Sequence, residues 1–330
     1  MHITIADARA LVEAAMAAVG YDAAEAAIVA DHLVDCELRG LGYGGLARAL
    51  SVVERIRNTT TPRRPITVLQ ETPSTACLDG GDTVGHVVGL RATELALAKA
   101  RQTGLAAVGA SKTWYTGMYS YYLERITAAG FAGMIAGSGT QIVAPHGGTE
   151  GRFGTNPIAF GFPTAAAPVI WDIGTADVMI GDVALKARLG EPLPAGQAFD
   201  ASGQPTCDAA AALRGAFTVW GGHKGSGLAM MVQILAMMVG QVPSPAPQRD
   251  SGIFVLVVNP ALFTSADEFR QRAAEYVQRV RDTRPLDPAR PVRAPFDRSR
   301  EERARRLAAG TIEVADKVVA GLRREAGIAG

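Results

Sequence analysis

The spacing of apolar residues predicts helices over the first 60 residues of the chain. Asp22 is followed three places later by Glu25, the pattern of a capping box, so a helix is expected to begin there. Apolar residues recur at helical spacing again from 46 to 56, and the polar, proline-containing stretch 58–65 ends this second helix. The N-terminal part of the chain is therefore predicted to be helical.

Beyond Ile66, short apolar runs of the kind that form strands alternate with helical patterns and glycine-rich turns. Strands are predicted at 76–78, 106–108, 134–136, 158–162, 169–171 and 253–258, and helices at 84–103, 118–129 and 225–239. The arginine-rich segment 266–324 is expected to be mostly helical. This alternation favours an α/β core with a helical lobe built from both chain ends. The predicted divisions are a helical segment 1–70, an α/β domain 71–262, and a helical segment 263–330 that packs with the N-terminal lobe.

Composition and charge exclude several classes of protein. Of the 330 residues, 48% are apolar and 20% are charged, which is too apolar for a disordered chain. The formal net charge of +1 creates no field that would attract nucleic acid or an anionic membrane. The three cysteines have no metal-ligand spacing, so neither a disulfide framework nor a metal site is expected. No secretory signal is visible, and the apolar run 228–239 is shorter than the roughly 20 residues of a membrane span. It is expected to be a core helix of a cytoplasmic protein.

The chain lacks the usual glycine-rich fingerprints of nucleotide binding. It has no GxxxxGK[ST] sequence, and no GxGxxG follows a predicted strand with an acidic residue about 20 positions later. A dinucleotide, if bound, is therefore not held by a Rossmann fold. Two other glycine-rich segments stand out, APHGGTEGRFGTNPIAFGFP at 144–163 and WGGHKGSGLAM at 220–230. In the second, His223 and Lys224 precede an apolar helix, where free N–H groups and an ammonium suit a phosphate or carboxylate. A tight turn is the alternative.

Taken in order, three segments resemble the malate/L-lactate dehydrogenase family of the non-Rossmann type. They are PHGGTEGRFGTNPIAFGFP, LPAGQAFDASGQPTCDAAAALRGAF and GGHKGSGL, and the resemblance extends nearly from end to end of the chain. The family also includes ureidoglycolate and sulfolactate dehydrogenases and Δ1-piperideine-2-carboxylate reductases. The resemblance implies an α/β domain that binds NAD(P) and a small carboxylate substrate. It also implies a homodimer with active sites near the subunit interface.

The resemblance assigns substrate-binding and proton-transfer roles to individual residues. The family motif RGxxSHGxxR appears as RGLGYGGLAR, so Arg48 takes the place of the arginine that binds the substrate carboxylate. Tyr43 stands at the serine position and Gly44 at the histidine position, so the usual proton donor is missing. Thr155 matches a threonine that contacts substrate. Asp182 matches an aspartate that orients the proton-donating group.

The resemblance also implies a set of cofactor contacts. The family sequence SxHFG corresponds to TWYTG, which puts a tyrosine at a second histidine position, although packing against the neighbouring helix accounts for it equally well. The implied cofactor-binding residues are Tyr115, Thr116, Gly117 and Met118, then Asp172, Ile173 and Gly174 in DIGTA, then His223 and Lys224.

Near the C-terminus the chain departs from the family pattern. A proline-glycine-glutamate motif is replaced by Pro295, Phe296 and Asp297, so the resemblance does not assign the cofactor contacts that usually follow it. The next residue, Arg298, begins the arginine-rich stretch RSREERARR. This stretch is either a solvated helix face or a contact to a cofactor phosphate, and the second interpretation slightly favours NADP over NAD.

The missing histidine separates three hypotheses of function. Reduction of a 2-keto acid needs an acid that protonates the oxygen, a contribution of ~10²–10⁴-fold. A cyclic imine can be protonated in solution, so a reductase of carboxylate-bearing cyclic imines, with Asp182 favouring the iminium, is slightly preferred. A 2-keto/2-hydroxy acid dehydrogenase is the alternative if a water donates the proton, or if cations lower the pKa of Tyr43 so that its phenol does. The third hypothesis is a degenerate family member that binds a ligand or nucleotide without turnover.

Overall fold

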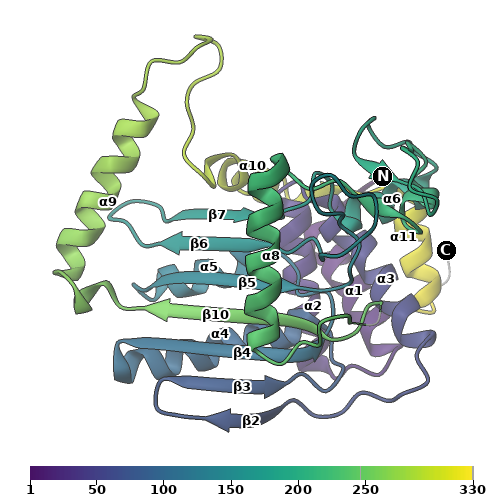
Figure 1. The fold of residues 1–330 in the computed structure, drawn as a ribbon, viewed down its shortest axis with the longest axis horizontal. Helices are drawn as coiled ribbons and strands as arrows, with labels where there is room; N and C mark the ends of the chain where they lie inside the picture. The colour runs from purple at the N-terminus through teal and green to yellow at the C-terminus, as the bar shows by residue number, and fades with distance from the viewer. Residues whose placement is uncertain (246, 329–330) are drawn as a thin grey trace.

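A mixed sheet of seven strands forms the centre of the computed structural model (Figure 1), which describes residues 1–245 and 247–328. In spatial order the strands are β2 (Thr67–Glu71), β3 (Thr75–Asp79), β4 (Leu105–Thr113), β10 (Ser251–Val258), β5 (Ala132–Ser138), β6 (Ile158–Phe162) and β7 (Val169–Ile173). In this sheet β3 and β4 are parallel, and all the other neighbouring strands are antiparallel. A Rossmann sheet is mostly parallel, so the prediction of a different α/β fold is confirmed.

Helices cover the two faces of this sheet unequally (Figure 1). Helices α4 (Gly85–Thr103) and α5 (Tyr119–Ala128) cover one face, where the central strand β10 buries Ile253, Val255 and Val257 completely. Burial of each such side chain is worth about 1.5–3 kcal/mol, so alternate residues of the apolar strand decide its orientation.

Helix α8 (Gly222–Met238) crosses the other face of the sheet alone (Figure 1). It was expected to be a core helix, and this expectation is wrong for half of its surface. Ala229, Val232 and Ala236 are buried, whereas several large apolar side chains are about half exposed or more, namely Met230, Met231, Ile234 and Met238. A helix that is apolar all round packs only one side against a sheet, so its outer side stays uncovered.

Both ends of the chain build one helical lobe. Helices α1 (Ile5–Ala17), α2 (Ala23–Leu38) and α3 (Leu46–Arg57) pack with α11 (Asp316–Glu325), and the short strands β1 (His2–Thr4) and β11 (Thr311–Glu313) pair beside them. Helix α10 (Asp297–Ala309) packs on α2, where the half-exposed Arg303 pairs at 2.6 Å with the buried Asp35. Helix α9 (Ala266–Arg281) instead projects from the body (Figure 1) and buries only Val277. Within segment 263–330, it is the part from α10 onward that packs against the N-terminal lobe.

The remaining elements show which local patterns were informative. The helix start expected at Asp22 is confirmed, because its carboxylate accepts a hydrogen bond of 2.8 Å from the Glu25 N–H. Strand β2 was not predicted, because all its residues are exposed at the sheet edge and no apolar alternation marks it. Residues 180–217 form a small cap around the buried Phe217, with α6 (Ile180–Leu189), α7 (Ala209–Ala212) and the hairpin β8 (Ala198–Phe199) and β9 (Ala216–Phe217). None of the described helices is long and apolar enough to cross a membrane.

Candidate active site

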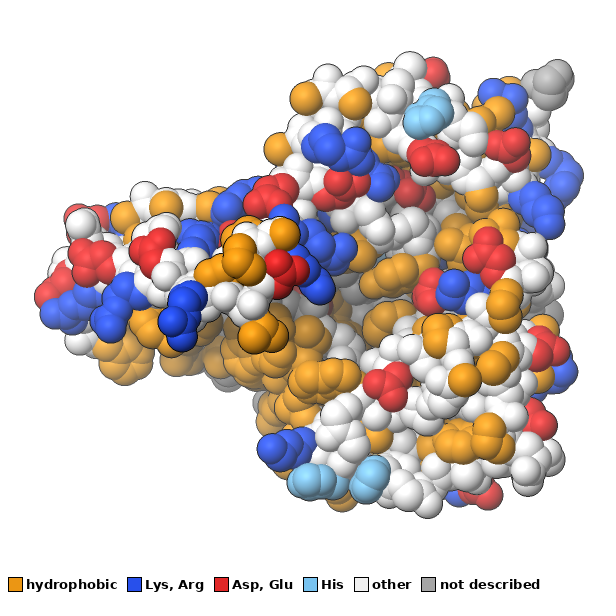
Figure 2. Space-filling model, turned by 90° about the horizontal axis from the view of Figure 1, so that it is seen from above, with side chains coloured by type: hydrophobic (Ala, Val, Ile, Leu, Met, Phe, Trp, Pro, Cys, Tyr) orange, Lys and Arg blue, Asp and Glu red, His pale blue; other side chains and the backbone are white. Residues whose placement is uncertain are grey.

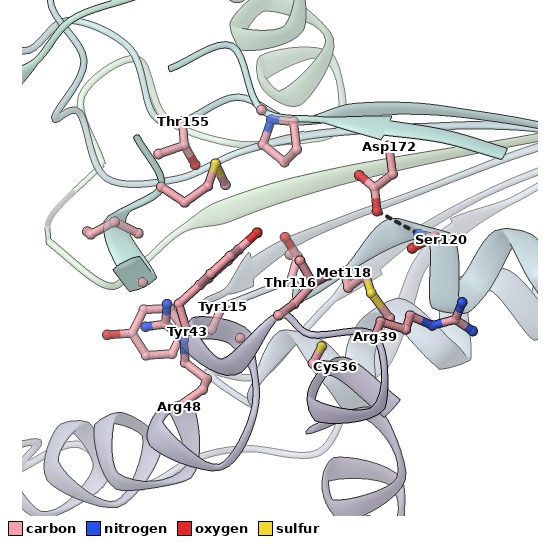
Figure 3. Close-up of a pocket in the computed structure, with 18 of the residues that line it drawn as sticks. Cys36, Arg39, Tyr43, Arg48, Tyr115, Thr116, Met118, Ser120, Thr155 and Asp172 are labelled. Carbon is pink, nitrogen blue, oxygen red and sulfur yellow. Dashed lines mark hydrogen bonds between the residues drawn. The ribbon is translucent and has the colours of Figure 1, made fainter. Parts of the chain in front are cut away.

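A cavity of about 580 Å³ lies where the strands of the sheet end against the helical lobe (Figure 3). It is lined by the segments that follow β4 and β5, by those that precede β6 and β10, and by residues of β7. These segments meet there because they lie at the same end of the antiparallel strands. The lobe contributes the end of α2, the 3-10 turn η1 (Gly42–Gly44) and α3, and the start of α10 closes another side. Among the residues predicted from the sequence, those that line the cavity are Tyr43, Arg48, Tyr115, Thr116, Gly117, Met118, Thr155, Asp172, Gly174 and Arg298.

Arg48 presents a guanidinium to this cavity without a carboxylate partner among the described residues. It comes from the first turns of α3, and its guanidinium carbon lies 4.3 Å from the centre of the Tyr115 ring. Figure 3 shows both side chains at the lobe side of the cavity, next to Tyr43. Because the aromatic face orients the cation without neutralising it, Arg48 is able to bind an incoming carboxylate.

The residues beside Arg48 provide no activated acid. Burial, together with nearby acidic groups, raises the pKa of Tyr43 to about 12. The condition under which its phenol would serve as the acid, a pKa lowered by neighbouring cations, is therefore not met. Burial also raises the pKa of the Cys36 thiol well above its usual range. A Cβ atom at Gly44 would lie 3.5 Å from the Cys36 sulfur, an ordinary contact, so the turn has room for the first atom of a side chain at this position.

His86 is a cavity residue that sequence reasoning missed. It lies in the first turn of α4, is almost completely buried and lines the cavity near Gly117. Burial lowers the pKa of His86 to about 3, which makes its imidazole neutral at physiological pH, and its Nδ1 has no partner among the described groups. The only sequence signal was the stretch GGDTVGH, which reads as a turn before a helix.

Asp172 brings a negative charge to the sheet side of the cavity. Its carboxylate accepts a hydrogen bond of 2.7 Å from the Ser120 N–H at the start of α5, drawn as a dashed line in Figure 3. Burial raises the pKa of Asp172 to about 6, so the carboxylate is mostly ionised at neutral pH. Thr116 lies nearby and shares a hydrogen bond of 3.0 Å with the Tyr119 hydroxyl.

Thr155 is held in place by a buried amide network. The next residue, Asn156, has a positive φ of 36° and donates from Nδ2 to the Ala229 carbonyl at 2.8 Å and to Gln233 Oε1 at 3.1 Å. Both acceptors belong to α8. This helix therefore anchors the GTNP turn from the face of the sheet that α4 and α5 do not cover. Gln233, which interrupts the apolar run of this helix, thus has a structural role inside the protein.

Four residues predicted for the site do not line this cavity. Asp182 lies in the first turn of α6, half-buried behind the wall that Ile180 and Gly181 form. Ile173 is the last residue of β7 and is also absent from the wall. His223 and Lys224 are exposed at the first turn of α8. Their side chains approach no part of this cavity within the single chain that the structure describes.

The start of α10 gives one end of the cavity a positive charge. Arg298 and Ser299 line it there, and Arg298 pairs with no carboxylate of the described residues. The altered motif before them still leads into the helix, and its first residue, Asp297, is fixed by bonds of 2.7 and 2.9 Å from Arg281 and one of 2.9 Å from the Ala294 N–H. Arg298 is therefore brought to the cavity wall despite the change in the motif.

Comparison with known proteins supplies the family. The model of the malate/L-lactate dehydrogenase family matches residues 3–323, and the chain belongs to this family. It is accordingly an NAD(P)-dependent oxidoreductase of small carboxylate-bearing substrates. Both the family resemblance and the fold class predicted from the sequence are thereby confirmed.

Individual relatives fall into two groups by reaction. The chain is 35% identical to an L-sulfolactate dehydrogenase of Methanothermobacter thermautotrophicus over 78% of each chain. It is also 35% identical to a Δ1-pyrroline-2-carboxylate reductase of Pseudomonas fluorescens over 66% of this chain and 69% of the relative. A solved dehydrogenase from Sinorhizobium meliloti superposes with a TM-score of 0.91 at 30% identity, over 99% of this chain and 98% of the other.

Proposed function

We propose that this protein is an NAD(P)H-dependent reductase of small cyclic imines that carry a carboxylate. The observation that carries the proposal is the lack of an activated acid beside Arg48, where Gly44 has no side chain and the pKa of Tyr43 is raised to about 12. The neutral His86 is no stronger an acid, since its pKa of about 3 means that the imidazolium is not populated at neutral pH. An imine nitrogen that is protonated in water needs no such acid, whereas a ketone oxygen does.

Two charged residues of the cavity suit an iminium carboxylate. Arg48 would bind the carboxylate through two parallel hydrogen bonds. Asp172, ionised at neutral pH, would favour the cationic iminium over the neutral imine. The sequence made Asp182 the first candidate for this electrostatic role. Because Asp182 lies behind the cavity wall, its effect on the substrate would be weaker than that of Asp172. Its negative charge acts instead on Tyr43, where it contributes to the raised pKa of the phenol.

The positive end of the cavity fits the phosphate of a dinucleotide. The described groups there are the guanidinium of Arg298, the hydroxyl of Ser299 and the free N–H groups at the start of α10. We propose NADP(H) as the cofactor, with Arg298 beside the 2′-phosphate, and residues 115–118 with Asp172 and Gly174 along the rest of the site. When bound, the dihydronicotinamide supplies the hydride.

A 2-keto acid reductase is the second candidate function. It is favoured by the likeness to an L-sulfolactate dehydrogenase, which covers more of the chain than the likeness to the pyrroline-2-carboxylate reductase of Pseudomonas fluorescens. In this case Tyr43 or a water molecule would supply the proton. The two functions differ in their demand for an acid, so they separate on substrate and on substitution at position 44.

A homodimer is the proposed assembly, and the outer side of α8 is its proposed interface. The exposed apolar residues of α8 lie over the same sheet face as Phe162 on β6 and Trp171 on β7, both about 41% exposed. Figure 2 shows hydrophobic side chains gathered in the recess between the projecting arm and the body. Such a patch is unusual for a monomer, and a second copy would cover it symmetrically. The cofactor roles of His223 and Lys224, at the end of this helix, depend on this assembly.

The first prediction tests the substrate class. Purified protein with NADPH should consume Δ1-piperideine-2-carboxylate, followed by absorbance at 340 nm, and should be much slower with pyruvate. Arg48→Met should raise KM for the imine about 100-fold with a smaller change in kcat, because a charge-assisted bidentate contact is lost. Arg57→Met, on the exposed end of the same helix, is the control and should behave as wild type. Consumption of pyruvate alone would make the second candidate correct.

The second prediction concerns position 44. The double variant Tyr43→Ser with Gly44→His should gain reduction of 2-keto acids by ~10²–10⁴-fold, because an imidazole supplies the missing acid. The room beside Cys36 allows its first atom to be accommodated. Tyr43→Ser alone is the matched control and should gain nothing. An unchanged keto-acid rate in a double variant that still reduces the imine would show that position 44 does not decide the substrate.

The third prediction concerns the choice of cofactor. Arg298→Ala should weaken NADPH binding about tenfold and leave NADH binding unchanged, measured by nucleotide fluorescence titration, because only NADPH carries the 2′-phosphate. Arg305→Ala is the control, since this arginine of the same helix already pairs with Glu302 at 2.8 Å. Equal loss for both nucleotides would place Arg298 elsewhere than at the 2′-phosphate.

The fourth prediction concerns assembly. Light scattering should give the mass of a dimer for the wild type and of a monomer for Met231→Glu with Met238→Glu, because two carboxylates would then be buried in the apolar interface. Leu69→Glu is the control and should stay dimeric, because this equally exposed residue belongs to β2, the edge strand at the opposite end of the sheet from β7. A monomeric wild type at micromolar concentration would be evidence against this interface.

A further inference from the structure

Glu37 is a buried carboxylate that does not line the cavity but touches the segment that carries Arg48. It lies near the end of α2 and is 4% exposed. Its Oε1 accepts a hydrogen bond of 2.8 Å from the N–H of Leu46, the first residue of α3. The N-cap residue of α3 is Gly45, which has no side chain to cap the helix. Glu37 thus supplies, from another helix, the cap that the local sequence lacks.

The turn between the two helices is shaped around this carboxylate. A Cβ atom at Gly45 would overlap the Glu37 side chain, and one at Gly42 would lie 3.5 Å from its Oε2. Backbone hydrogen bonds close the turn, because the Gly44 N–H donates to the Leu41 carbonyl at 2.8 Å and the Gly45 N–H donates to the Gly42 carbonyl at 3.2 Å. The glycines of RGLGYGG therefore let the chain wrap closely over Glu37, and this close contact determines the path of the backbone at Tyr43 and Arg48.

We propose that Glu37 is a positioning residue, which holds Arg48 and Tyr43 against the cavity through the turn 42–45 and the start of α3. Arg48 lies two residues after the capped N–H, and its own N–H donates to the Gly45 carbonyl at 2.9 Å. Loss of the cap would free the first turn of α3 and with it the base of the Arg48 side chain. The inference rests on the proposed function in one respect, which is that Arg48 binds the substrate carboxylate.

The charge of Glu37 makes this positioning sensitive to pH. Burial raises the pKa of Glu37 to about 7, against the lowering effects of the Leu46 hydrogen bond and of the Arg306 charge. Ionisation strengthens a hydrogen bond at a helix N-terminus, so the turn is held more tightly above pH 7. The titratable and charged groups that act on Glu37 are Cys36 on its own helix and Arg306 on α10. Arg306 also donates to the Glu37 backbone carbonyl at 2.7 Å and pairs with Glu302.

Ionisation of Glu37 affects the stability of the folded state in the opposite direction to its effect on substrate binding. A carboxyl group whose pKa rises from 4.5 to about 7 on folding holds its proton more strongly in the folded state. The folded state is therefore progressively destabilised as pH rises from about 4.5 to about 7. Removal of the titrating group should abolish this part of the pH dependence of the unfolding midpoint.

The experiment compares Glu37→Gln, which keeps an oxygen acceptor but does not ionise, with Glu37→Ala, which removes the cap. The probe is pyrrole-2-carboxylate, a planar carboxylate that cannot accept a hydride and stays ionised from pH 6 to 8.5. The ratio of its dissociation constants at pH 6 and pH 8.5, measured with the NADPH-saturated enzyme, should be about tenfold larger in the wild type than in Glu37→Gln, where the ionisation of Asp172 remains. Glu37→Ala should bind at least tenfold more weakly at every pH. Glu54→Gln, an exposed carboxylate of α3, is the control and should retain the wild-type profile.

Hydrogen exchange and thermal unfolding provide readouts that need no ligand. Amides of residues 42–48 should exchange faster in Glu37→Ala and not in the Glu54 control, and the wild-type midpoint should fall relative to Glu37→Gln between pH 5 and pH 7. If the wild type binds neither the probe nor the imine, the proposed function fails, and hydrogen exchange still decides the role of Glu37. If the wild type binds the probe and both Glu37 variants match it in affinity, pH profile and exchange, the positioning role is overturned. Should the alanine variant not fold, the pH profile of Glu37→Gln alone decides.

Discussion

The buried guanidinium of Arg39 joins the three parts of the molecule that meet at the cavity. Its Nε donates to Asp35 on α2 at 2.7 Å, and its Nη2 to Glu124 on α5 at 2.5 Å. From α10, Ser299 accepts a bond of 3.3 Å, and the Phe296 ring lies 4.8 Å from the guanidinium carbon. Burial of the Arg39 charge costs several kcal/mol, which its ion pairs and hydrogen bonds offset. The cavity therefore depends on a cluster that no single part of the chain is able to form.

Burial determines most of the chemistry of the cavity. It disfavours the charged form of every titratable group, so Tyr43 and Cys36 keep their protons while His86 does not take one up. Charge survives where a partner or the solvent compensates it, as the Ser120 N–H does for Asp172 and the Tyr115 ring does for Arg48. The Arg48 cation and the Asp172 anion thus stand among neutral groups in one part of the cavity, and the other arginines that line it, Arg39, Arg293 and Arg298, lie toward α10. This arrangement suits a zwitterionic substrate that brings its own proton.

Helix α8 links the core, the site and the outer surface. Through Gln233 and the Ala229 carbonyl it holds Asn156 and so the turn that carries Thr155. Its outer side carries the exposed methionines, and its first turn carries His223 and Lys224. Substitutions inside this helix and on its surface should thus have different consequences, the first for the geometry of the site and the second for assembly. An apolar run with one interior glutamine is the sequence pattern that such a double role produces.

The sequence by itself determined the helices and strands with strong local patterns, and through its motifs the family. The Asp22 cap and the central strand β10 were predictable because neighbouring residues decide them, whereas the exposed edge strand β2 had no local signal. Only the tertiary structure decided that His86 lines the cavity, that Asp182 lies behind its wall, and that Glu37 caps a helix nine residues further along. It also decided the direction of the Tyr43 pKa shift. These properties depend on desolvation and on contacts between distant segments, which residue order alone does not express.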